Sequence, residues 1–119
     1  MIVLIADDEK EIVELLKGRF IAKGHSVNTA YDGKEALELI KSNIYDLIFL
    51  DHNMPGLTGL ELLRYIKENN LKPKIAIITA YAEIDEFFMK RVGADEYLTK
   101  PVKMKDIDDI IDKYLKPTS

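Results

Sequence analysis

The fold is decided by the stretch Ile48-Phe49-Leu50-Asp51-His52-Asn53-Met54-Pro55-Gly56. The apolar run of residues 47–50 predicts a short strand that is buried on both faces. The run stops at one carboxylate, Asp51, and a Pro-Gly pair then marks a loop. Asp51 therefore ends a core strand, at the edge where open α/β sheets bind their ligands. An isolated Asp before Pro-Gly is more often a turn or capping residue, so its role depends on its neighbours.

Five apolar segments of strand length alternate with five segments of helical periodicity. The expected strands are Ile2–Ala6, Ser26–Ala30, Leu47–Leu50, Lys74–Thr79 and Glu96–Thr99. The expected helices cover residues 9–23, 34–41, 60–69, 84–92 and 105–115. Parallel neighbours need right-handed crossovers, so this alternation predicts a doubly wound α/β fold. We expect one domain, residues 1–119, with a five-stranded parallel sheet in the flavodoxin-like order 2-1-3-4-5 and five helices.

Helical periodicity also predicts which side chains face the core. In the first helix the expected inward residues are Ile12, Leu15, Leu16 and Phe20. In the fourth helix they are Ile84, Phe88 and Val92, with Phe87 and Met89 on the flanks.

The composition excludes several classes of protein. The 119 residues include no cysteine, which rules out disulfides and thiolate chemistry. The net charge of -4, without a basic run, disfavours nucleic-acid binding. The longest apolar runs are strand-sized, and the N-terminal residues do not resemble a secretory signal. We expect a cytoplasmic protein that binds neither nucleic acid nor a membrane.

Polar side chains lie at the ends of four predicted strands. They are Asp7, Asp8, Asp51, Thr79 and Lys100. In the expected strand order these ends converge at one edge of the sheet. Any one of these residues taken alone would be assigned as a cap or a turn residue. Together they predict a functional pocket, because such edges are where these sheets bind ligands.

The predicted pocket has the chemistry of a phosphoryl site. Three carboxylates repel one another unless a cation is present or one of them is protonated. Mg²⁺ suits a site with few carboxylates, several waters and room for a phosphate oxygen. Lys100 adds a positive charge that can pair with Asp51 or with an incoming anion. Asp51 is ionised at neutral pH, so it needs no general base to act as a nucleophile in phosphoryl transfer.

Four stretches together carry a resemblance to a known family. They are Asp7-Asp8, Asp51 with Met54-Pro55 and Gly59, Thr79-Ala80, and Gly93-Ala94-Asp95-Glu96-Tyr97-Leu98-Thr99-Lys100-Pro101. With this spacing the chain resembles the receiver domain of two-component response regulators, the CheY-like superfamily. The similarity covers essentially the whole chain.

The resemblance implies that Asp51 accepts a phosphoryl group from a phosphohistidine on a sensor histidine kinase or a histidine phosphotransfer protein. It implies that Asp8, Asp51 and the backbone carbonyl of Asn53 ligate Mg²⁺, with Mn²⁺ as a substitute. Asp7 would act through a bound water. Such a domain is a signalling phosphoacceptor that assists its own phosphorylation and dephosphorylation, and is not otherwise an enzyme.

The resemblance also implies a conformational switch. Thr79 would move onto the phosphoryl group, and Tyr97 would swing into the vacated space. This would change the surface of the fourth helix, fifth strand and fifth helix, where a downstream protein partner would bind. Tyr97 has an alternative interpretation as a half-buried strand residue with a solvated hydroxyl. The Lys100-Pro101 peptide is expected to be cis.

Three further positions are candidates for tuning the phosphoryl lifetime. Asn53 and Tyr81 match family positions that control water access. His52 departs from the family pattern, which more often has an apolar or aromatic residue after the phosphorylated Asp. It could titrate near neutral pH and make the chemistry pH-sensitive, or it could be a hydrogen-bonded structural residue.

Two other functions compete with this interpretation. A small Mg²⁺-dependent phosphatase with an aspartyl-phosphate intermediate would carry Asp-x-Asp after its first strand, whereas Asp7 and Asp8 are adjacent. A receiver-like binding module that is never phosphorylated would usually have lost an acid or the lysine. All five pocket residues are present here.

Overall fold

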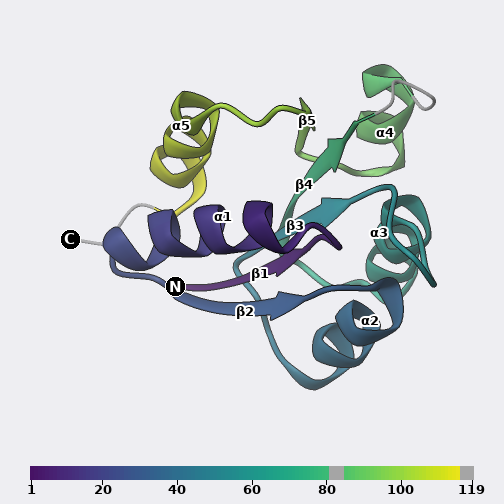
Figure 1. The fold of residues 1–119 in the computed structure, drawn as a ribbon. Helices are drawn as coiled ribbons and strands as arrows, with labels where there is room; N and C mark the ends of the chain where they lie inside the picture. Colours follow the sequence, from purple (N-terminus) through teal and green to yellow (C-terminus); the bar gives the residue numbers. More distant parts are fainter. Residues whose placement is uncertain (81–84, 116–119) are drawn as a thin grey trace.

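Five parallel strands form one sheet in the order β2-β1-β3-β4-β5 within residues 1–80 and 85–115, which the computed structural model describes (Figure 1). The strands are β1 (Ile2–Ala6), β2 (Ser26–Ala30), β3 (Leu47–Asp51), β4 (Lys74–Thr79) and β5 (Glu96–Thr99). The helices are α1 (Lys10–Ala22), α2 (Gly33–Ser42), α3 (Gly59–Glu68), α4 (Glu86–Val92) and α5 (Met104–Tyr114). The predicted fold class and strand order are confirmed.

Alternate side chains of the central strands are buried on opposite faces of the sheet, as a strand's two-residue period requires. Val3 and Ile5 of β1 belong to a core cluster that also contains apolar residues of α1 and α5. Leu4 and Ala6 belong to a second cluster, with apolar residues of α2, α3 and α4. Figure 1 shows these two groups of helices on either side of the sheet. Burial on both faces explains why the strands are apolar runs rather than alternating patterns.

Short polar motifs begin several of the helices. The Thr58 side chain accepts a hydrogen bond from the Glu61 N–H, and the Glu61 carboxylate accepts one from the Thr58 N–H, forming a capping box before α3. Asp85 caps α4 by accepting a hydrogen bond from the Phe88 N–H at 2.7 Å. None of the helices in the described ranges is long and apolar enough to span a bilayer.

Two predicted helix faces are wrong in part, since Leu16 and Phe20 of α1 are buried as expected and Val92 of α4 packs against the core. In α1, Leu15 is 56% exposed and Val13 is buried instead, because the sheet contacts Val13, Leu16 and Phe20 at helical spacing. In α4, Phe88 is exposed and Met89 is the buried residue.

The error in α4 has a physical reason in its length. The helix has seven residues and starts at Glu86, so few of its positions can face the core: Met89 is buried, and Val92 packs against the same core cluster while partly exposed. Ile84, which was expected in the inward stripe, lies outside the described residues.

Gly33 allows two loops to approach each other at the carboxyl edge of the sheet. A Cβ at this position would lie 2.2 Å from the carbonyl oxygen of Leu57 and 2.6 Å from its Cα. The Gly33 N–H donates to the Pro55 carbonyl at 2.9 Å. The loop that follows Asp51 is therefore supported by the first residue of α2.

Replacing Gly33 with alanine is expected to destabilise the protein by about 2 to 3 kcal/mol, because backbone must shift to admit the methyl group. The matched control is Gly18→Ala in the exposed middle of α1, where nothing lies within 4 Å of the added Cβ. That change is expected to stabilise the helix by about 0.5 to 1 kcal/mol. Urea unfolding of both variants measures the two effects. Equal midpoints for the two variants would contradict the close contact at Gly33.

Candidate functional site

Backbone pairing beyond the strand ends holds two acidic residues in place. The Asp7 N–H donates to the Ala30 carbonyl at 3.0 Å, and the His52 N–H donates to the Ile78 carbonyl at 2.8 Å. The sheet hydrogen bonds therefore continue past β1 and flank Asp51 at the end of β3. Asp7 and Asp51 are each only 1% exposed.

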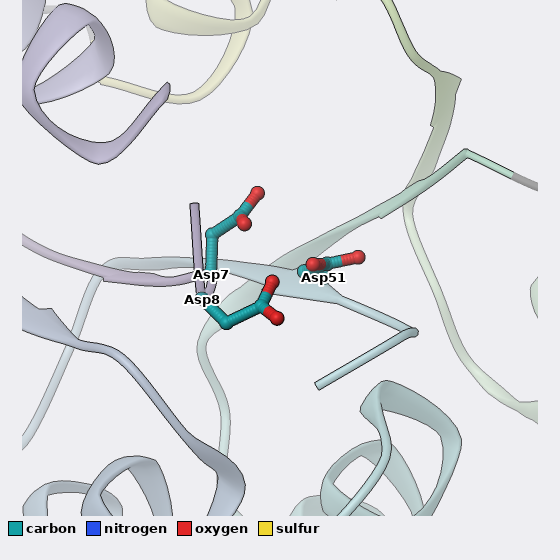
Figure 2. A group of neighbouring side chains, drawn as sticks. All are labelled: Asp7, Asp8 and Asp51. Atoms are coloured by element: carbon teal, nitrogen blue, oxygen red, sulfur yellow. The ribbon is translucent and has the colours of Figure 1, made fainter. Parts of the chain in front are cut away.

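Three carboxylates gather at this edge, as the sequence predicts. Asp7, Asp8 and Asp51 each offer a carboxylate oxygen within 4.8 Å of the others, and Asp8 is the exposed member (Figure 2). Asp7 and Asp8 follow β1, whereas Asp51 comes from the neighbouring strand β3. Adjacent parallel strands thus unite residues that are more than 40 positions apart in the sequence.

Lys100 lies against this cluster and is paired with three carboxylates. Its Nζ is 3.3 Å from Asp51 Oδ2, 3.2 Å from Asp7 Oδ2 and 2.6 Å from Glu9 Oε1. The lysine side chain is only 10% exposed. The Lys100-Pro101 peptide that follows β5 is cis, as expected.

The electrostatics of the site are dominated by buried negative charge. Burial raises the pKa of Asp7 from 3.8 to about 7, and the neighbouring Asp51 carboxylate adds to the rise. A hydrogen bond from the Glu9 N–H and the charge of Lys100 act in the opposite direction. For Lys100, burial disfavours the charge, but the Glu9 hydrogen bond and the two aspartates outweigh it and raise the pKa. Lys100 is therefore a fixed cation at neutral pH.

The donor set of the cluster fits a hard divalent cation. Asp7 Oδ2 is buried and accepts no hydrogen bond from the described part of the chain, although Lys100 Nζ lies nearby. An unsatisfied buried carboxylate oxygen is costly unless a cation or an ordered water compensates it. Oxygen ligands from a few carboxylates are what Mg²⁺ prefers. The cluster therefore supports Mg²⁺ binding.

Thr79 and Asn53 contact each other beside Asp51. The Thr79 hydroxyl donates to Asn53 Oδ1 at 2.9 Å. The Asn53 N–H donates to Asp51 Oδ1 at 3.1 Å. The side chain of Asn53 thus holds the Thr79 hydroxyl in this structure, a contact that the sequence did not predict.

The other predicted site residues lie at different places. His52 is buried against the start of α3, where the Leu60 N–H donates to its Nδ1 at 3.4 Å. This position agrees with its interpretation as a hydrogen-bonded structural residue. Tyr97 is half-buried in β5 and contacts the core cluster under α3 and α4. Burial raises its pKa, with smaller effects from Asp85 and Glu86. Tyr81 lies outside the described residues.

Sequence reasoning missed one residue of this site. Glu9 follows the acidic pair directly as the N-cap residue of α1, and this place beside Asp7 and Asp8 was the available signal. Gly59 was named in the sequence as part of the family resemblance, but its contact was not predicted. A Cβ at Gly59 would come within 2.9 Å of His52 Cα, which depends on how α3 packs against the end of β3.

Comparison with known proteins gives consistent results over most of the chain. Residues 3–112 match the family model of the response regulator receiver domain. The transcriptional regulatory protein DltR of Streptococcus agalactiae is 36% identical over 108 residues, which are 90% of this chain and 48% of DltR. The chain therefore spans about half the length of the curated relatives it matches.

Solved structures show the same similarity in three dimensions. The receiver domain of the Francisella response regulator 1452 is 38% identical with a TM-score of 0.82, over 96% of this chain and 93% of that one. TrrA of Thermotoga maritima, solved in complex with Mg²⁺-BeF, is 35% identical with a TM-score of 0.84, over 95% and 97% of the two chains. The fold, the acidic cluster and these matches lead to one conclusion: the chain belongs to the receiver domain family of response regulators.

Proposed function

We propose that Asp51 of this receiver domain accepts a phosphoryl group from a phosphohistidine on a sensor histidine kinase or a histidine phosphotransfer protein. The observation that carries the proposal is the position of the Asp51 carboxylate. It ends β3, lies 3.3 Å from the Lys100 ammonium and shares its pocket with Asp7 and Asp8. The family match favours this function over a phosphatase, and the complete pocket favours it over a binding module that is never phosphorylated.

The proposed transfer balances with the groups present. An oxygen of Asp51 forms a bond to phosphorus while the phosphorus–nitrogen bond of the donor breaks, and the imidazole nitrogen leaves with the electron pair. Lys100 neutralises charge on the phosphoryl oxygens, which is the main requirement of such a transfer. The Thr79 hydroxyl, now bonded to Asn53, would rotate to donate to the same oxygens.

Asp8, Asp51 and the backbone carbonyl of Asn53 would hold Mg²⁺, and Asp7 would contact it through a water. Mn²⁺ would substitute, because the ligands are all oxygens. When bound, the ion supplies charge neutralisation for the carboxylates and the phosphoryl group. The unsatisfied Asp7 Oδ2 supports this assignment.

Phosphorylation would change the face made of α4, β5 and α5, where a downstream protein partner would bind. Phe87 and Phe88 of α4 are 71% and 40% exposed, which suits a protein-binding surface. Tyr97 lies in β5 on the same side, and its reorientation would change that surface.

We propose that residues 1–119 form one such domain. The effects of His52, Asn53 and Tyr81 on the lifetime of the phosphoryl group stay predictions. A cytoplasmic location also stays a prediction.

The proposal is tested by intact mass after incubation with phosphoramidate. We expect wild type to gain one phosphoryl group, about 80 Da, only when Mg²⁺ is present, and Asp51→Asn to gain none. Asp46→Asn is a matched control, because this exposed aspartate lies before β3, at the opposite edge of the sheet. An adduct on Asp51→Asn, or no adduct on wild type with any donor, would overturn the proposal.

A further inference from the structure

The hydrogen-bonding capacity of Lys100 is fully used before any phosphoryl group arrives. An ammonium has three N–H donors. In this structure the Lys100 ammonium donates to Glu9 Oε1 at 2.6 Å, to Asp51 Oδ2 at 3.3 Å and to Asp7 Oδ1 at 3.4 Å. A phosphoryl oxygen can therefore bind Lys100 only if one of these carboxylates gives up its place.

The three carboxylates differ in how tightly they hold the lysine and in how easily they can leave. Glu9 makes the shortest contact, 2.6 Å, against 3.2 Å for Asp7 and 3.3 Å for Asp51. Asp7 and Asp51 are 1% exposed, whereas the Glu9 side chain is 56% exposed. A half-exposed carboxylate returns to water at little cost, but a buried one has no solvent to return to. Glu9 is thus both the closest partner of Lys100 and the one that can leave.

The position of Glu9 in the chain leaves its carboxylate available for this contact. Glu9 is the N-cap residue of α1, but its side chain caps no helix N–H. Its backbone N–H donates to Asp7 Oδ1 at 2.8 Å, which anchors the residue beside the pocket. The side chain can therefore move without breaking the start of the helix.

We propose, resting on the proposed function of Asp51, that Glu9 is a positioning residue that competes with the phosphoryl group for Lys100. In the unphosphorylated domain Glu9 holds the ammonium beside Asp51. An incoming phosphoryl oxygen takes over this N–H, and the Glu9 carboxylate moves into solvent. Glu9 thereby opposes phosphorylation of Asp51.

The test compares Glu9→Gln and Glu9→Ala with Glu11→Gln, which removes an exposed charge at the second residue of α1. The rate constant for phosphorylation by phosphoramidate at low donor concentration is expected to rise about threefold in both Glu9 variants, as suits a screened charge pair. Glu11→Gln is expected to match wild type. A slower Glu9→Ala with a normal Glu9→Gln would overturn the proposal, because it would mean that Glu9 only orients Lys100. Glu9 variants equal to Glu11→Gln would also overturn it.

A second measurement needs no phosphorylation. The ¹⁵N resonance of the Lys100 ammonium in the unphosphorylated protein is expected to shift in Glu9→Gln and to stay unchanged in Glu11→Gln. An unchanged resonance in Glu9→Gln would mean that Glu9 does not contact Lys100 in the unphosphorylated protein, which would overturn the proposal. If wild type accepts no phosphoryl group while this resonance shifts, the proposed function of Asp51 has failed and the contact has not. If wild type is phosphorylated and the Glu9 variants behave as wild type, the competition alone has failed.

Discussion

Replacing Lys100 with methionine is expected to slow phosphorylation of Asp51 by phosphoramidate about 100-fold, the usual effect of removing one donor to a developing oxyanion. Lys100 is the only cation within the described residues that is paired with both Asp7 and Asp51. Methionine keeps a side chain of similar length and removes the charge. The rate of mass gain in saturating Mg²⁺ measures the effect.

The matched control for this change is Lys103→Met. Lys103 is exposed, three residues farther along the chain, and its side chain makes no cap contact with α5. The Lys103→Met variant is expected to be phosphorylated at the same rate as wild type. Circular dichroism shows whether Lys100→Met is folded before its rate is interpreted. A folded Lys100→Met that is phosphorylated at the wild-type rate would remove Lys100 from the proposed chemistry.

Replacing Asp7 with asparagine is expected to stabilise the metal-free protein by about 2 kcal/mol at pH 8. Burial raises the pKa of Asp7 from 3.8 to about 7, so ionised Asp7 opposes folding above that pH. Each pKa unit corresponds to about 1.4 kcal/mol, so a rise of this size allows a gain of this order, and the opposing effect of the Lys100 charge is already part of the raised pKa. Asparagine can still accept the hydrogen bond from the Glu9 N–H. Urea unfolding in the presence of EDTA measures the difference.

The pH dependence of the wild-type protein follows from the same raised pKa. The folded protein binds a proton at Asp7 that the unfolded chain releases above about pH 4. The contribution of neutral Asp7 to the free energy of unfolding is therefore fully present below pH 3.8. It is lost as the pH rises through 7. Metal-free wild type is expected to be more stable at pH 5.5 than at pH 8.

The control for this pH dependence is Asp8→Asn, which changes the exposed member of the cluster. It is expected to keep the fall in stability between the two pH values, whereas Asp7→Asn is expected to lose it. Adding Mg²⁺ at pH 8 is expected to stabilise wild type more than Asp7→Asn. Equal stability of metal-free wild type at pH 5.5 and pH 8 would contradict the raised pKa.

Much of the fold could be predicted from local patterns. The apolar runs and their polar ends indicate each strand, and β1, β2, β4 and β5 have the predicted bounds. The strand order was expected as the common solution for a doubly wound sheet of this size, and right-handed helical crossovers are compatible with it. This order places Asp7, Asp8, Asp51 and Lys100 at one edge, where the structure brings them together.

Helix faces were harder to predict than strands. Leu15 and Leu16 are consecutive, so periodicity alone allows either to face the core. The structure buries Leu16 and exposes Leu15, because contact with the sheet selects one rotation of α1. In the short helix α4 the choice of Met89 over Phe88 is again made by packing.

The sequence by itself determined the α/β fold and the polar strand ends that form the acidic edge with its lysine, because each segment carries its periodicity and its strand end locally; the strand order was expected from what is common in such sheets. Only the tertiary structure decided that Glu9 pairs with Lys100, 91 positions away, and that His52 is buried against α3. It also decided that the Thr79 hydroxyl is bonded to Asn53. These contacts join residues from separate segments of the chain, which come within reach of one another only after the sheet and helices have packed.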